Sequence, residues 1–207
     1  MERKYVITIG RQLGSGGRII GEKLASKLGI SFYDKELIQI ASQESGLGRE
    51  FFERADEKRP YSVFGGLFSL RGTIAEEPFS TYYLNNETLF KIQSDVIRRL
   101  AERSSCLFVG RCADYVLSGH PCILNIFITA DLADRVKRIA ERQKLTPAKA
   151  RDYIEKADKK RAAYYNYFSS KPWGMADSYH LCINSSWLGL DATVESICSF
   201  ASKRFGL

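Results

Sequence analysis

The sequence has few histidines, no long apolar run and no paired cysteines, and each of these shortages argues against a class of protein. Two histidines and five cysteines, with no Cys-x-x-Cys pair, argue against a zinc site or a disulfide framework. The apolar runs are far shorter than the roughly 20 residues that span a bilayer, and too few apolar residues precede Gly10 to form a signal-peptide core. We therefore expect a cytoplasmic protein without a membrane segment, whose thiols are reduced and mostly buried.

The sequence does carry a moderate excess of positive charge. Its 31 lysines and arginines outnumber 24 aspartates and glutamates, giving a net charge of +7, and residues 135–171 are the most basic stretch. A basic surface favours anionic partners, which include polyphosphate ligands, nucleic acid and acidic lipid. The net charge alone does not distinguish among these partners.

The hydrophobic pattern predicts strands that alternate with helices. Strands are expected at 5–9, 30–33, 106–109, 123–128 and 180–183, and helices at 17–28, 34–46, 81–103, from Asp131, from Pro147 and at 190–204. Asp131 is expected to cap its helix, and Thr146-Pro147 is a favourable helix start. Residues 59–78 have no sustained period and predict a long loop. The alternation predicts an α/β fold with a mainly parallel sheet covered on both faces.

A glycine-rich segment joins the first predicted strand to the first predicted helix. From Gly10 to Arg18 it reads Gly-Arg-Gln-Leu-Gly-Ser-Gly-Gly-Arg. Glycines can adopt positive φ and leave their amides uncovered, so these amides can converge on an anion, and the helix adds its positive N-terminal end. The alternative is a tight turn in which glycine serves packing only. Four glycines between a strand and a helix favour a phosphate-binding loop.

The loop departs from the common pattern Gly-x-x-x-x-Gly-Lys-[Ser/Thr]. Aligning Gly14–Gly16 on that pattern places Gly17 at the lysine position and Arg18 at the hydroxyl position that normally holds magnesium. Arg11 or Arg18 could supply the missing positive charge. The candidate ligands of a hydrated magnesium ion are Ser15 and Asp34.

Several segments, taken in order, resemble the cytidylate kinase-like family, a branch of the P-loop nucleoside monophosphate kinases. They are residues 9–17, 32–38, 109–114, 126–130 followed by Arg135 and Arg138, 158–161 and 181–186. The resemblance implies one domain over residues 1–207 with a three-layer P-loop kinase fold and a five-stranded parallel sheet. It also implies an acceptor-binding insertion at 34–103, a helical lid at 143–176, ATP with Mg²⁺, and a nucleotide or other small molecule as acceptor.

The resemblance assigns roles to individual residues. Arg111 matches a family arginine that contacts the acceptor, and Arg161 matches the lid arginine of Asp-x-x-Arg, with Asp158 as its partner. Asp34 matches an aspartate near the acceptor and metal, or it caps the next helix. The candidate catalytic residues are Arg18, Asp34, Arg111, Asp158 and Arg161. The candidate nucleotide-binding residues are Gly10, Arg11, Gly14, Ser15, Gly16, Gly17, Arg18, Arg135 and Arg138.

Two basic or aromatic patterns have alternative interpretations. Arg135 and Arg138 could contact donor phosphate or adenine, or could form a solvated helix face together with Arg142. The aromatic run at 164–168 is expected to pack the base of the lid onto the core, with base stacking as the alternative.

Two departures from the family put the acceptor base in question. Cys112 stands where cytidylate kinases have a base-recognising aspartate, with Asp114 two positions later, and Ile154 replaces a further lid arginine. We predict ATP-dependent phosphoryl transfer to a nucleoside monophosphate (CMP- or dCMP-like) or a related small acceptor. The alternative is a catalytically weak or inactive nucleotide-binding regulatory protein. Nucleic-acid binding, which would weaken steeply with salt, is the least favoured function.

Overall fold

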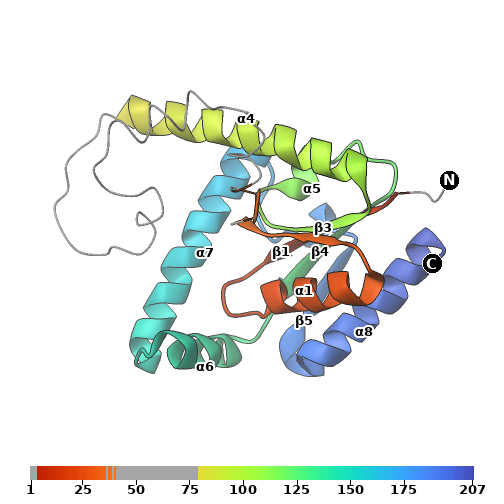
Figure 1. The fold of residues 1–207 in the computed structure, drawn as a ribbon. Coiled ribbons are helices and arrows are strands. Elements are labelled where there is room, and N and C mark those ends of the chain that lie inside the picture. The colour runs from red at the N-terminus through yellow and green to blue at the C-terminus, as the bar shows by residue number, and fades with distance from the viewer. Residues whose placement is uncertain (1–3, 36, 39, 41–78) are drawn as a thin grey trace. The chain divides into compact units, whose positions relative to one another are not determined.

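The computed structural model in Figure 1 describes residues 4–35, 37, 38, 40 and 79–207. Contacts divide the chain into two compact units, one of Met1–Lys35 with Arg98–Leu207 and one of Glu36–Ile97. The loop predicted at 59–78 and most of the helix predicted at 34–46 lie outside the described residues. All the candidate site residues belong to the first unit.

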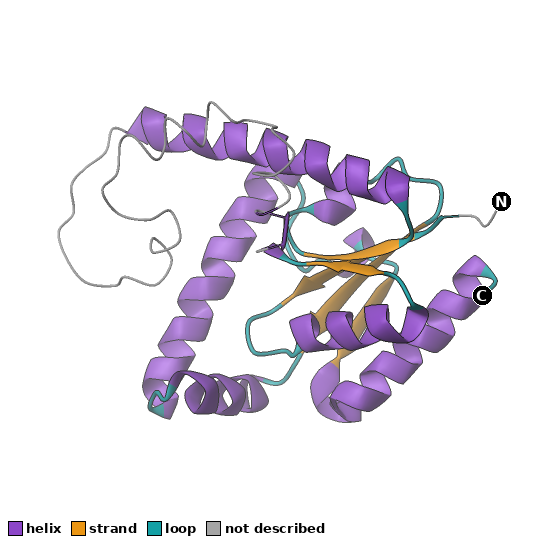
Figure 2. Ribbon diagram, in the orientation of Figure 1, coloured by secondary structure: helices purple, strands orange, loops and turns teal. Residues whose placement is uncertain are grey.

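Five parallel strands form one sheet in the order β2-β3-β1-β4-β5 (Figure 2). They are β1 (Val6–Arg11), β2 (Ser31–Tyr33), β3 (Cys106–Val109), β4 (Ile123–Thr129) and β5 (Leu181–Asn184). In the central strand, Ile7 pairs with Leu107 on one side and Leu124 on the other. The apolar runs that predicted these strands are buried because parallel strands have both faces covered. Each strand begins and ends within two residues of its predicted bounds.

Helices α1 (Gly17–Leu28) and α8 (Ser185–Phe205) pack together against one face of the sheet. Their apolar stripes and the facing strand residues form the main core, which includes Ile7, Ile9, Ile20, Leu24, Leu107, Leu124, Ile126, Val194 and Ile197. As predicted, α1 ends at Gly29. Helix α8 begins five residues before its predicted start, because the Asn184 side chain accepts a hydrogen bond from the N–H of Ser186 at 3.0 Å. Its backbone is non-helical at Gly189, close to the predicted boundary.

The other helices of the first unit follow β3 and β4. The short helix α5 (Ala113–Val116) lies on the face of the sheet opposite α1 and α8, which completes the three predicted layers (Figure 1). Helices α6 (Leu132–Gln143) and α7 (Pro147–Ser169) pack on each other through a small apolar cluster, which consists of Ile139, Ala150 and Ile154 with Leu13 beside them. Ile154 is therefore a core residue here.

The helix-capping predictions for α6 and α7 have different outcomes. Thr146 caps α7 by accepting the N–H of Lys149 at 3.4 Å, as expected. Asp131 occupies the N-cap position of α6, but the prediction that its side chain caps the helix is wrong. The Asp131 carboxylate instead accepts a hydrogen bond from Nδ2 of Asn184 at 2.8 Å, which joins β5 to the start of α6.

Helix α4 (Phe79–Arg103) agrees with the predicted helix at 81–103, and Ile92, Val96 and Ile97 on its expected inner face are buried. Among the described helices, none is long and apolar enough to cross a membrane.

The cysteines are unpaired, and both histidines form hydrogen bonds with the backbone. All five cysteines are free thiols; Cys106, Cys112 and Cys122 are buried, Cys198 is partly buried, and Cys182 is exposed on the edge strand β5. Nδ1 of each histidine accepts a backbone N–H, from Cys122 to His120 and from Asn125 to His180.

Candidate functional site

The glycine-rich segment turns from the end of β1 into α1, as the sequence predicts. Gly14 and Gly16 adopt left-handed φ angles of 82° and 80°. Neither of their N–H groups donates a hydrogen bond within the described part of the chain. The first turn of α1 adds amides that have no acceptor inside the helix. These donors and the positive helix end make the loop suited to an anion.

Neighbouring elements pack closely against this loop at three of its glycines. A Cβ on Gly10 would lie 2.7 Å from Cδ2 of Phe127 in β4, and one on Gly16 would overlap the Leu190 side chain of α8. A Cβ on Gly14 would lie 2.9 Å from the carbonyl oxygen of Arg135 in α6. The loop is therefore fixed by the sheet and by two helices, and has no room for side chains at these points.

We predict that Gly14→Ala lowers the free energy of unfolding by about 1 to 3 kcal/mol, the cost of a strained left-handed residue. The backbone oxygen facing the new methyl group cannot rotate away as a side chain would. Chemical denaturation measures this loss. Gly119→Ala is the control, because nothing lies within 4 Å of a Cβ there; equal stability of the two variants would contradict the prediction.

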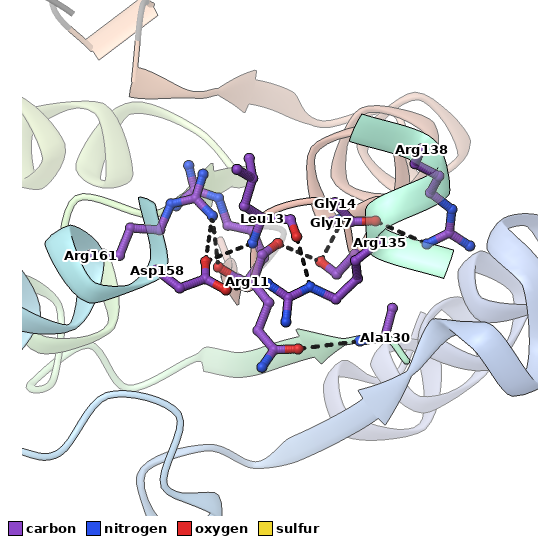
Figure 3. Close-up of polar contacts among 11 residues, drawn as sticks. Arg11, Leu13, Gly14, Gly17, Ala130, Arg135, Arg138, Asp158 and Arg161 are labelled. Atoms are coloured by element: carbon purple, nitrogen blue, oxygen red, sulfur yellow. Dashed lines mark hydrogen bonds and ion pairs between the residues drawn. The ribbon is translucent and has the colours of Figure 1, made fainter. Parts of the chain in front are cut away.

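Asp158 of α7 joins the loop to α6 and α7 (Figure 3). Its Oδ1 accepts the N–H of Leu13 at 2.8 Å and Nη1 of Arg161 at 3.3 Å, and its Oδ2 accepts Nη2 of Arg135. Arg135 is 6% exposed, and its Nε donates to the carbonyl of Leu13 at 2.8 Å. Asp158 and Arg135 thus bind both backbone polar groups of one loop residue.

The three regularly spaced arginines of α6 have different surroundings. Arg135 is bonded to Leu13 and Asp158, and Nη1 of Arg138 donates to the carbonyl of Gly14 at 3.0 Å. Arg142 is exposed. The interpretation as a solvated face therefore applies to Arg142, whereas Arg135 and Arg138 contact the loop (Figure 3).

Three arginine side chains lie beside the loop, where β1 and β3 end. The Arg11 guanidinium lies over Gly110, since a Cβ built there would overlap its Nη1. Arg161 donates to the carbonyl of Arg11 at 3.4 Å. The guanidinium of Arg111 lies 5.6 Å from the ring centre of Tyr164, and its buried Nε has no hydrogen-bond partner in the described residues. We call Arg11, Arg111 and Arg161 the arginine cluster.

The electrostatics of the arginine cluster are those of an anion site. Burial, together with the charges of Arg161 and Arg111, lowers the pKa of Arg11 to about 9, although Asp34 and Asp158 oppose this. Burial also lowers the pKa of Arg161. Arg11 stays protonated at neutral pH, and an anion bound here would relieve the unfavourable concentration of positive charge.

The backbone at the end of β3 is strained. Gly110, Arg111 and Cys112 have φ angles of 81°, 59° and 53°. Left-handed conformations are unfavourable for arginine and cysteine, and such strain often marks functional sites. It orients the Arg111 side chain at the carboxyl edge of the sheet, where parallel α/β folds bind ligands.

Arg18, Asp34 and Ser15 are arranged differently from the metal site of a common phosphate loop. Nε of Arg18 lies 2.7 Å from Oδ2 of Asp34, which is 4% exposed, and its Nη1 lies 3.5 Å from Glu22. The buried hydroxyl of Ser15 donates to the carbonyl of Gln12 at 2.9 Å, inside the loop. The described residues contain no group of three or more metal-ligating side chains. A magnesium ion here would therefore depend mainly on phosphate oxygens and water, which it readily accepts.

The side chains of Cys112 and Asp114, which lie where the acceptor base is expected to be recognised, are not free to contact a ligand. Cys112 is buried, and Oδ2 of Asp114 accepts the hydroxyl of Tyr165 at 2.6 Å. This bond ties α7 to α5, and Tyr165 is itself buried. The sequence did not indicate this bond. It also did not indicate that Leu13 packs on α6 and α7, although Leu13 is the single apolar residue between Gly10 and Gly17 and was the available signal for that packing.

We predict a pH dependence from Asp114. Burial raises its pKa above the ordinary value, although the bond from Tyr165 lowers it in part. A raised pKa contributes stability that is fully present below the unfolded-state pKa and is lost as pH rises through the folded-state pKa. Asp114→Asn should therefore gain stability relative to wild type across that rise, measured by urea denaturation at a series of pH values. The exposed Asp177→Asn is the control, and parallel profiles for Asp114→Asn and wild type would contradict the prediction.

Comparison with known proteins shows which family and fold this chain resembles. The profile of the cytidylate kinase-like family matches residues 6–187. A cytidylate kinase of Halobacterium salinarum (strain ATCC 29341 / DSM 671 / R1) is 28% identical over 111 residues, which are 52% of this chain and 57% of that protein, so the match spans little more than half of this relative.

Solved structures share the fold. An uncharacterized protein from Eubacterium ventriosum ATCC 27560 has a TM-score of 0.74 at 26% identity, covering 97% of this chain and 99% of that one. Shikimate kinase from Bacteroides thetaiotaomicron has a TM-score of 0.52 at 16% identity, covering 98% and 99%, and shows the P-loop kinase fold alone. Because the family profile covers most of the sequence, the chain belongs to the cytidylate kinase-like family.

Proposed function

We propose that this protein transfers the γ-phosphoryl group of ATP, with Mg²⁺, to a nucleoside monophosphate or a related small acceptor. The main support is the arginine cluster, and within it the buried Nε of Arg111 with no partner in the described residues. A phosphate oxygen would satisfy this donor, and the planar fork of arginine suits phosphate.

The loop and the arginine cluster fit the phosphates of ATP, which supplies the transferred group. The uncovered amides of Gly14 and Gly16 would bind phosphate oxygens, while Arg135, Arg138 and Asp158 hold the loop in shape. We assign the magnesium-facing role to Asp34, whose carboxylate would exchange its ion pair with Arg18 for the hydrated ion, and not to Ser15, whose hydroxyl donates to a carbonyl within the loop.

Arg111 would position the acceptor. Phosphoryl transfer depends mainly on alignment and on neutralising charge, and a phosphate acceptor is already ionised at neutral pH, so a site rich in arginine suits this chemistry. Asp114 is engaged by Tyr165 and Cys112 is buried, so neither supports cytosine recognition. CMP and dCMP remain candidates among other acceptors. We further propose that residues 143–176 act as a lid, that residues 34–103 bind the acceptor, and that the reaction is cytoplasmic, where free thiols stay reduced.

A regulatory nucleotide-binding protein is the second candidate. It is favoured by Gly17 at the lysine position, by the ion pair of Arg18 with Asp34, and by the inward hydroxyl of Ser15. Such a protein would bind ATP without acceptor-dependent turnover.

The test is to mix the purified protein with MgATP and separately with CMP, dCMP, UMP, AMP and GMP, and to measure ADP release against a no-acceptor control. Release that depends on one acceptor is expected and identifies it. ATP binding without turnover on any acceptor would favour the regulatory function, and failure to bind ATP would overturn both functions.

A further inference from the structure

Compared with the common phosphate-loop pattern, a basic residue and a glycine have exchanged positions in this loop. With Gly16 as the second glycine of Gly-x-x-x-x-Gly-Lys-[Ser/Thr], the first glycine position is residue 11 and the lysine position is residue 17. In this chain residue 11 is arginine and residue 17 is glycine.

The two exchanged residues meet in space. A Cβ on Gly17 would lie 2.6 Å from Cβ and 3.1 Å from Cγ of Arg11. The stem of Arg11 therefore occupies the room from which a lysine side chain at position 17 would start. Its guanidinium continues to Gly110, where again only a glycine leaves space. Gly17 and Gly110 thus both leave room for the side chain of Arg11.

From this arrangement we infer that Arg11 supplies the phosphate-binding cation that a lysine at position 17 supplies in other phosphate loops. The inference rests on the proposed function and deepens it. The cation starts from the end of β1 and not from the first turn of α1. Arg18, the other arginine of the loop, is exposed and pairs with Asp34 and Glu22.

The surroundings of Arg11 also argue against a purely structural role. A structural arginine is normally bonded to carboxylates or carbonyls, because burying an unpaired charge is costly. The Arg11 guanidinium donates no hydrogen bond to the described residues, and two other arginines of the cluster lie nearby. This arrangement leaves its donors available to a ligand with several negative charges.

The experiment measures MgATP affinity by calorimetry, so it does not depend on turnover. Arg11→Met, which keeps the stem and removes the charge, should weaken binding about 10- to 100-fold, as expected for lost charged hydrogen bonds. Arg11→Lys should lose less, because it keeps the charge. Arg142→Ala, an exposed arginine of α6, is the control and should bind as wild type does. Thermal unfolding of each variant verifies that it is folded.

The exchange itself is tested by the double variant Arg11→Gly/Gly17→Lys, which restores the common pattern. It should bind MgATP at least tenfold more tightly than Arg11→Gly alone. Gly17→Lys alone should bind no better than wild type, because Arg11 occupies the space. Wild-type affinity in Arg11→Met, or no gain in the double variant, would overturn the inference and leave the proposed function standing. A wild-type protein that does not bind MgATP would overturn both.

Discussion

Replacement of Asp158 by alanine is expected to lower the free energy of unfolding by about 3 kcal/mol, the effect of breaking a buried ion pair. Arg135 would be left buried without its carboxylate, and the N–H of Leu13 would lose its acceptor. Because these contacts fix the loop, MgATP binding should weaken as well. Urea denaturation and calorimetric titration measure the two losses.

Two variants on α7 make this prediction specific. Asp152→Ala removes an exposed aspartate from the same helix and should leave stability and binding nearly unchanged. Asp158→Asn retains an oxygen for Leu13 but removes the charge that Arg135 faces, so its stability should lie between those of Asp158→Ala and wild type. If Asp158→Ala were as stable as Asp152→Ala, Asp158 would not hold the loop.

Replacement of Arg111 by alanine is expected to lower kcat/KM for the acceptor about 100-fold or more, with a much smaller effect on MgATP affinity. Loss of one positioned donor to a transition-state oxygen typically costs about 10²- to 10³-fold. Arg111 is suited to that role because its Nε is buried without a partner in the described residues and its guanidinium lies 5.6 Å from the ring centre of Tyr164. Steady-state kinetics with the preferred acceptor measure the change.

The matched control for Arg111 is Arg151→Ala, an exposed arginine on α7. Calorimetry on both variants separates acceptor positioning from ATP binding. An Arg111→Ala enzyme with unchanged kcat/KM would exclude an acceptor role for this residue. Equal losses of ATP affinity and turnover would assign it to the donor phosphates.

The sheet was predictable because its signals are local. Each strand is a short apolar run that a glycine or polar turn ends, and a strand buried on both faces needs little else. The bounds of β3 were predicted to the residue for this reason. Helix α8 was placed too late because Gly189 interrupts the apolar pattern, whereas the structure places a first turn, capped by Asn184, before the interruption.

The site was predictable only in part, because its contacts join residues far apart in sequence. Spacing alone gives Arg135, Arg138 and Arg142 the same interpretation, yet only the first is buried against Asp158. Likewise, nothing in the sequence links Arg11 to Gly110, since the contact depends on the parallel pairing of β1 with β3. The residue types that favour an anion site can therefore be identified from the sequence, but the contacts that each side chain makes cannot.

Phosphoryl transfer from ATP to the acceptor can be followed directly with a label on the γ-phosphate. The protein is incubated with γ-³²P-labelled ATP, Mg²⁺ and each nucleoside monophosphate, and the labelled products are separated by chromatography. We expect the label to move into one nucleoside diphosphate, and Arg111→Ala to slow this transfer about 100-fold or more. Label that stays in ATP, or that appears only as inorganic phosphate, while ATP binding is intact would contradict this expectation.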